Sequence, residues 1–507
     1  MSFPATTLLA EPAPAEAERT PRRWPAYATV LLVLLSLFAV THIGKTVFPY
    51  DDSYITLHSA QVLHTGADRN YPGVPALTGE TSAPFVGLVY LLLFIFPPLL
   101  ALNVAGWIGV FLYGLGLMHL AFRLKLEPRP AWLFVFIGLA CGPVPIHWVN
   151  GLETSCALAA VTWTLSFATG NRPRDWVAAG FLSGLSAGVR PDLLPFALIV
   201  TCFAAWNLLR RPSRSSRAWF AVLALILAAA APVLLCSFWY LKTTGSPLPL
   251  TGIAKRYFFA EDHWPLLHKI TEEGKQIMGF CAMVGPLVLV LPRLAKFTLG
   301  KVLLLVMALF VAALFVQFPG EFKVNELRYP VVLVPLLLWG LGMMVARARG
   351  EHRRNGQRLM VICALYATAV LAVCLRYYKD ERDFFERGPH QIAAWCQTHI
   401  PPGTPILVHD AGYLAYSTNF RTVDIVGLKT PAAIPLNRQY TWPTAGRGRA
   451  RAVTKMAAAF GSHYLIVNLE WPPVAHLPQE IHSLGWGVDL VYWSGTYGIY
   501  RLTPPAE

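Results

Sequence analysis

Long apolar runs, separated by short basic loops, occupy most of the first 376 residues of this chain. Each run is close to the roughly 20 apolar residues that a helix needs to cross the hydrocarbon core of a bilayer. Of the 507 residues, 55% are hydrophobic and only 14% are charged, which is more apolar surface than a water-soluble fold of this length can bury. The sequence therefore predicts an α-helical polytopic membrane protein whose first partner is the lipid bilayer.

About eleven of these runs are predicted to cross the membrane. Loops rich in Arg and Lys usually stay in the cytoplasm, so the basic loops between these runs are predicted to be cytoplasmic. Successive basic loops are separated by two spans, as they must be if all of them lie on one side. A further apolar run, 83–97, is cut short by Pro97-Pro98, so it is predicted to lie in the outer interface without crossing. The predicted spans are 26–48, 102–122, 131–149, 152–169, 176–190, 191–209, 218–241, 277–292, 298–318, 329–346 and 359–376.

The positions of the spans divide the chain into three parts. A cytoplasmic N-terminal tail, 1–25, precedes a transmembrane domain, 26–376, with outer loops at 49–101 and 242–276. From 377 to 507 the sequence becomes more polar, and strand-like and helical runs alternate, which predicts a small extracytoplasmic α/β domain. The expected location is a bacterial inner membrane, with this C-terminal domain on the periplasmic side. The predicted strands are 406–408, 422–426, 464–467 and 489–492, and the predicted helices are 383–399 and 450–460.

The formal net charge of +14 does not indicate a nucleic-acid partner. The basic residues lie in loops between apolar runs, and they form no stripe with interleaved stacking aromatics. The charge is instead typical of cytoplasmic loops in a membrane protein, so nucleic acid is excluded as an expected partner.

Two adjacent carboxylates, Asp51 and Asp52, follow the first predicted span and face the outside in this topology. Acids beside lipid are costly and usually functional. A capping role for Asp52 in the helix that follows explains one acid and leaves the other unexplained. The pair therefore favours a catalytic or ion-binding site.

Further acids and cations are predicted on the same side of the membrane as this pair. They are Glu80, Glu153, Lys255, Arg256 and Arg328. Two chemistries fit such a set. One is ion-coupled transport, and the other is transfer of a sugar from a lipid phosphate, whose leaving group needs cations and whose acceptor hydroxyl needs a base. Charges gathered at helix ends on one face, beside a folded outer domain, favour transfer over transport.

The order of several short motifs adds a resemblance to a known family. The chain resembles the glycosyltransferase C superfamily of polyprenyl-phosphate-sugar-dependent membrane enzymes, and within it the terminal β-(1→2)-arabinofuranosyltransferases. The motifs that carry the resemblance are Asp51-Asp52-Ser53-Tyr54-Ile55, Gly79-Glu80-Thr81-Ser82, Asn150-Gly151-Leu152-Glu153-Thr154, Arg190-Pro191-Asp192, Ala254-Lys255, Arg328-Tyr329 and, in the C-terminal domain, Asp410-Ala411-Gly412-Tyr413.

The resemblance implies roles for the acids. Asp51 is expected to be the general base that deprotonates the acceptor hydroxyl, and Asp52 either shares that role or helps to bind a divalent ion such as Mg²⁺, Mn²⁺ or Ca²⁺. Glu153 is expected to orient the acceptor or to complete a metal site with Asp51 and Asp52; the alternative is a first-turn acid favoured by the helix dipole. Glu80 is expected to contact substrate, or else to be a turn residue before a helix.

The resemblance also implies roles for the cations. Lys255, Arg256 and Arg328 are expected to neutralise the departing phosphate, although anchoring to lipid headgroups is an alternative for each. Arg190 and Asp192 are expected to form a buried structural pair.

The expected function is transfer of a sugar, with arabinofuranose as the sugar that the resemblance suggests. The donor would be a polyprenyl phosphate, and the acceptor a cell-envelope glycan, glycolipid or protein. A transporter or flippase of lipid-linked sugars is the alternative, and a non-enzymatic scaffold that binds envelope glycans is a third possibility.

Overall fold

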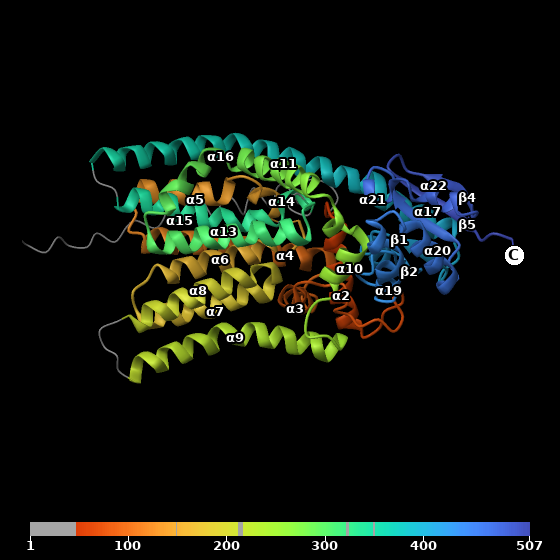
Figure 1. The fold of residues 1–507 in the computed structure, drawn as a ribbon, viewed down its shortest axis with the longest axis horizontal. Helices are drawn as coiled ribbons and strands as arrows, with labels where there is room; N and C mark the ends of the chain where they lie inside the picture. Colours follow the sequence, from red (N-terminus) through yellow and green to blue (C-terminus); the bar gives the residue numbers. More distant parts are fainter. Residues whose placement is uncertain (1–46, 149, 211–215, 321–323, 348–349, 507) are drawn as a thin grey trace, which may run out of the picture.

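The computed structural model describes residues 47–148, 150–210, 216–320, 324–347 and 350–506. A bundle of long helices lies at one end of the molecule, and a smaller domain with a β-sheet lies at the other (Figure 1). The predicted tail, 1–25, and nearly all of the first predicted span, 26–48, lie outside the described residues.

Seven helices of the described part are long and apolar enough to cross a membrane, which confirms the polytopic helical fold. Single helices form three of them: α4 (Pro98–Arg123), α9 (Ser216–Thr244) and α13 (Thr298–Gln317). The other four combine adjoining elements: η2 and α8 (Pro191–Leu209), α11, η4 and α12 (Leu266–Leu294), α14, η5 and α15 (Asn325–Arg347), and α16, η6 and α17 (Gly350–His399).

Shorter helices occupy three other predicted spans. They are α5 (Pro128–Ala140), α6 (Thr154–Ala168) and α7 (Pro173–Val189). Helix α3 (Ala83–Leu92) ends before Pro97, and its ten residues reach only about 15 Å, which is too short to cross a bilayer. The total of eleven crossings stays a prediction.

Small residues let the helices of the bundle approach closely. Helix α4 packs along α6, and α7 packs along α9. A Cβ at Gly184 of α7 would lie 2.0 Å from the carbonyl oxygen of Ala229 in α9, so only glycine fits at this crossing. A continuous apolar core joins α4 to α8, α13, α15 and α16.

The C-terminal domain contains a five-stranded sheet in the order β2-β1-β3-β5-β4. Strands β1 (Pro405–Val408), β2 (Arg421–Asp424) and β3 (Tyr464–Asn468) are parallel, and the hairpin of β4 (Gly487–Trp493) and β5 (Tyr497–Thr503) is added antiparallel to β3. The four predicted strands are confirmed, whereas β5 was not predicted. The helices of this domain that follow β1 are α18 (Tyr413–Ser417), α19 (Ala433–Leu436), α20 (Arg449–Phe460), α21 (Pro472–Ala475) and α22 (Leu477–Ser483).

One continuous helix connects the two parts of the molecule. Helix α16 (Gly350–Phe385) continues through the π-helical turn η6 (Glu386–His390) into α17 (Gln391–His399), with no loop between the bundle and the sheet domain (Figure 1). The expected domain boundary at 377 falls inside this helix.

Two helices, α2 (Asp51–Thr65) and α10 (Thr251–Phe259), lie between the bundle and the sheet domain in Figure 1. Helix α2 packs against α18, and α10 packs against the turn η7 (Asn437–Thr441) of the C-terminal domain. The residues expected to act therefore gather where the bundle meets this domain.

Candidate functional site

The two aspartates at the start of α2 have different partners. Both oxygens of the Asp51 carboxylate accept backbone N–H groups of the C-terminal domain, from Gly412 at 2.7 Å and from Tyr413 at 2.7 Å. A Cβ at Gly412 would lie 2.2 Å from the Asp51 carbonyl oxygen, so a glycine is needed for this close approach. Asp51 thus fastens the C-terminal domain to α2.

Asp52, one position further along the helix, lines a large cavity and contacts the bundle. Its Oδ2 accepts from Arg328 Nη1 at 2.8 Å and from Asn325 Nδ2 at 3.1 Å. Its side chain stays 33% exposed, so a substrate in the cavity can reach it.

Arg328 is the charged centre of the site. Its Nη2 donates to both oxygens of Glu153, at 2.8 and 2.9 Å, while Nη1 holds Asp52. Arg328 and Glu153 are both buried, at 8% and 4% exposed. One guanidinium therefore joins two carboxylates, from α2 and from the turn before α6, that are a hundred residues apart in the sequence.

A strained turn positions Arg328. Asn325, Glu326 and Leu327 have φ angles of 46°, 56° and 63°, a left-handed conformation that costs energy for residues other than glycine. Buried contacts hold the turn: His147 Nε2 lies 3.0 Å from the Glu326 carbonyl oxygen, and the Tyr377 hydroxyl donates to Glu326 Oε1 at 2.5 Å. Strain of this kind is typical of functional sites, and the sequence did not indicate it.

The predicted pair of Arg190 and Asp192 forms, with Arg190 buried and the Asp192 side chain 22% exposed. Arg190 donates through Nε and Nη2 to the two carboxylate oxygens of Asp192, at 3.1 and 2.6 Å. Its Nη1 donates to the carbonyl oxygen of Arg328 at 2.6 Å, and its guanidinium lies over the Tyr329 ring. The pair is more than structural, because Arg190 and Asp192 also line the cavity.

The cavity has a volume of about 520 Å³. Five of the seven residues proposed from the sequence line it, each from a separate segment: Asp52, Glu80, Glu153, Lys255 and Arg328. Its other lining residues include Thr56, Arg190, Asp192 and Tyr329. The other two residues proposed from the sequence, Asp51 and Arg256, do not line the cavity.

Glu80 lies in the cavity wall and is 4% exposed. Its Oε2 accepts from the Thr56 hydroxyl at 3.2 Å, and its backbone carbonyl accepts from the Tyr240 hydroxyl at 3.2 Å. Burial raises the pKa of the Glu80 carboxyl to about 7, although the nearby Lys429 ammonium and the hydroxyls of Ser59 and Thr56 lower it.

The two predicted phosphate-binding residues of α10, Lys255 and Arg256, point in different directions. Lys255 lines the cavity, with its ammonium 6.0 Å from the centroid of the Tyr329 ring. Arg256 is exposed and pairs with Asp262 at 2.8 Å, and its guanidinium lies over the Trp442 ring of the C-terminal domain. Adjacent helical residues point about 100° apart, so only one of the two faces the cavity.

The three acids expected to bind a metal are not arranged around a common point. Asp51 is bonded to the C-terminal domain, and the Arg328 guanidinium lies between Asp52 and Glu153. Within the described ranges, no group of three or more His, Cys, Asp or Glu side chains is placed to hold a metal ion. These residues as arranged do not fit a three-carboxylate metal site, and a divalent-ion requirement stays a prediction.

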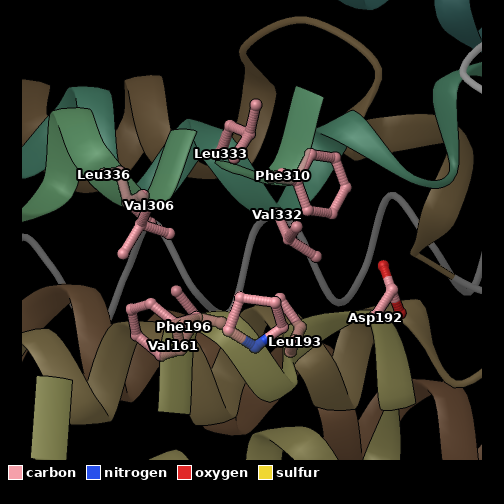
Figure 2. A pocket seen from close by; sticks show the side chains of 10 residues that line it. Val161, Asp192, Leu193, Phe196, Val306, Phe310, Val332, Leu333 and Leu336 are labelled. Carbon is pink, nitrogen blue, oxygen red and sulfur yellow. The ribbon is translucent and has the colours of Figure 1, made fainter. Parts of the chain in front are cut away.

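A small apolar void of about 10 Å³, room for about one water molecule, adjoins the cavity. Asp192, Pro195 and Phe310 line both spaces. Figure 2 shows Asp192 at one end of a row of apolar side chains, with Phe196 and Val161 on one side and Val306 and Leu336 on the other. The site therefore combines charged lining residues with apolar ones from the bundle.

A family model, a domain of unknown function (DUF8728), matches residues 377–499, which is most of the C-terminal domain. No curated protein matches the chain.

Two solved structures of one protein share the fold over nearly the whole chain. ArnT from Cupriavidus metallidurans bound to undecaprenyl phosphate aligns with a TM-score of 0.53 at 13% identity, covering 96% of this chain and 100% of that one. Its apo form aligns with a TM-score of 0.52 at 14% identity, covering 95% and 99%. At such low identity the likeness concerns the fold alone. The chain has the glycosyltransferase C-type fold of a multi-pass membrane protein, with a small C-terminal sheet domain.

Proposed function

We propose that this protein is a membrane glycosyltransferase that takes a sugar from a polyprenyl-phosphate donor. The observation that carries the proposal is the cavity itself, which combines Lys255, Arg190 and Arg328 with carboxylates and with an apolar lining from Leu194, Phe310 and Leu314. A lipid phosphate has the complementary chemistry, an anion joined to a long hydrocarbon. The fold shared with a protein solved with undecaprenyl phosphate supports the same donor class.

In this proposal the cations bind the phosphate that leaves. Bond cleavage at the anomeric carbon places additional negative charge on the phosphate, and fixed cations stabilise that charge without reorganisation. Lys255 sits on the short helix α10 at the cavity wall, and Arg328 is fixed by Asp52 and Glu153. The prenyl chain would lie against the apolar part of the cavity wall, which α8 and α13 supply.

The acceptor hydroxyl needs a base, and we assign this role to a carboxylate of the cavity rather than to Asp51. Both Asp51 oxygens already accept backbone N–H groups, and its side chain contributes nothing to the cavity lining. Arabinofuranose as the sugar, an envelope glycan, glycolipid or protein as the acceptor, and an inner-membrane location with the C-terminal domain outside belong to the proposal.

The test is transfer by the purified protein in detergent, with a panel of radiolabelled polyprenyl-phosphate sugars and an extract of envelope glycans and lipids as acceptor. We expect label from one donor to appear in acceptor material and polyprenyl phosphate to be released in equal amount. If no donor is consumed while donor binding persists, the proposal is wrong and transport of the lipid-linked sugar becomes the better interpretation. Assays with EDTA and with added Mg²⁺, Mn²⁺ or Ca²⁺ check the metal requirement.

Lys255→Met is expected to raise KM for the donor about tenfold or more, because a cation that contacts the donor phosphate is lost. Lys255→Arg should keep most of the affinity. The neighbouring Arg256→Met is the matched control, since Arg256 pairs with Asp262 away from the cavity, and it should leave KM for the donor nearly unchanged. Equal effects of the Met variants at 255 and 256 would contradict the assignment of Lys255 to the phosphate.

A further inference from the structure

Four carboxylates line the cavity, and an arginine holds three of them. Arg328 contacts Asp52 and both oxygens of Glu153, and Arg190 contacts both oxygens of Asp192. A carboxylate that is paired with a guanidinium is a weak base, because the positive charge favours the ionised form. These three acids are therefore suited to holding the arginines in place.

Glu80 is different from the other three. Among the described residues, no arginine is hydrogen-bonded to Glu80, and its buried Oε1 has no hydrogen-bond partner within bonding distance, while its Oε2 accepts from the Thr56 hydroxyl. An unsatisfied buried oxygen in a cavity wall is costly and needs a reason, and a substrate hydroxyl would supply the missing partner.

We propose that Glu80 is the catalytic base that accepts the proton of the acceptor hydroxyl. This inference rests on the proposed transferase function and names the residue that the function needs. The oxygen of the acceptor forms a bond to the anomeric carbon of the sugar as the bond from that carbon to the phosphate oxygen breaks. The electron pair of the broken bond leaves with the polyprenyl phosphate, and the acceptor proton moves to Glu80, so charge and atoms balance.

The surroundings of Glu80 fit this role. Its carboxyl pKa of about 7 is near neutral pH, where a substantial fraction of the carboxyl is ionised and the carboxylate is still basic enough to accept a proton. The charged groups that act on it are the Lys429 ammonium, which lowers the pKa, and the Glu153 carboxylate, which raises it. Lys429 is fully buried and is held by the Ser59 hydroxyl at 3.1 Å, and burial lowers the pKa of its own ammonium.

The backbone before Glu80 permits this arrangement. Gly79 has a φ of 87°, and a Cβ there would lie 2.6 Å from Cδ of Lys429. The glycine thus lets the loop lie directly on the Lys429 side chain of the C-terminal domain, which closes Glu80 off from water on that side.

The deciding experiment is the pH dependence of transfer by the full-length protein with a defined donor. Wild type should lose rate about tenfold per pH unit below about pH 7, since the protonated carboxyl cannot accept a proton. Glu80→Gln is expected to lower the rate about 10²–10⁴-fold and to remove this dependence. Asp52→Asn should lower the rate but keep the inflection.

Sodium azide separates a base from a binding residue. Azide is already an anion and needs no base, so Glu80→Gln should form the glycosyl azide at nearly the wild-type rate, while Asp52→Asn should be impaired with azide as well. An inflection that persists in Glu80→Gln, or equal loss with azide and with the hydroxyl acceptor, would overturn the role of Glu80. Transfer by wild type in the same assays tests the proposed function itself. If wild type transfers no sugar, both the proposed function and the role of Glu80 are wrong, whereas failure of the Glu80 predictions alone leaves the proposed function standing.

Discussion

Arg328→Met is expected to abolish transfer and to destabilise the protein by about 3–5 kcal/mol, the largest effect of any single substitution in the site. The methionine fills a similar volume, but it leaves the buried Glu153 carboxylate largely uncompensated, with only Arg190 Nε, 4.0 Å from Glu153 Oε1, as a counter-charge. Removing one partner of a buried pair costs this much. Thermal unfolding in detergent, followed at fixed detergent and lipid content, measures the stability, and donor consumption measures the activity.

The double variant Arg328→Met with Glu153→Gln is the control for the charge argument. Neutralising Glu153 removes the uncompensated charge, so most of the lost stability should return while transfer stays absent. If the double variant is as unstable as Arg328→Met alone, the loss comes from packing of the guanidinium rather than from its charge. Arg328→Lys should keep the charge but lose the forked geometry that reaches Asp52 and Glu153 together.

The helices of the bundle were predictable because they depend on local pattern, since apolar runs of bilayer length specify helices. The side of the membrane on which the site lies stays a prediction from the basic loops. The partners of Arg328 were not predictable, since Asp52 and Glu153 are 276 and 175 residues away from it in the sequence. Such distances are bridged only by the packing of the whole bundle.

In the C-terminal domain, too, some elements were predictable from the sequence and others were not. The parallel strands β1, β2 and β3 consist of short runs of β-branched and apolar residues, and the sequence predicted them. Strand β5 was missed although Gly495 marks the hairpin turn before it, because Gly498 and Arg501 interrupt its apolar alternation. The continuous helix from α16 into α17 was also unexpected, since the predicted span ended at 376 and a separate helix was predicted to begin at 383.

The adjacent aspartates are the clearest case of what a motif leaves undecided. Side chains at successive positions of a helix point about 100° apart, so Asp51 and Asp52 cannot both face one cavity squarely. Nothing in the sequence near them says which of the two faces it. The answer comes from Gly412 and Tyr413, about 360 residues later, whose backbone N–H groups donate hydrogen bonds to the Asp51 carboxylate.

Asp51→Ala and Asp52→Asn are therefore expected to fail in different ways. Asp51→Ala removes two hydrogen bonds from backbone N–H groups, each worth about 0.5–1.5 kcal/mol, so the C-terminal domain should loosen from α2 and become sensitive to protease. The molecules that keep the domain in place should still transfer sugar. Asp52→Asn keeps the shape and loses the charge that fixes Arg328, so it should lower kcat while proteolysis stays at the wild-type rate.

The comparison needs both measurements on both variants. Limited proteolysis reports the contact between α2 and the C-terminal domain, and kcat per molecule of intact protein reports the chemistry. Gly412→Ala serves as an independent probe of the contact, since its new Cβ would lie 2.2 Å from the Asp51 carbonyl oxygen and should push the two parts apart without altering any acid. If Asp51→Ala instead removes transfer from a protein as protease-resistant as wild type, Asp51 acts in the chemistry itself, and the separation of roles between the two aspartates is wrong.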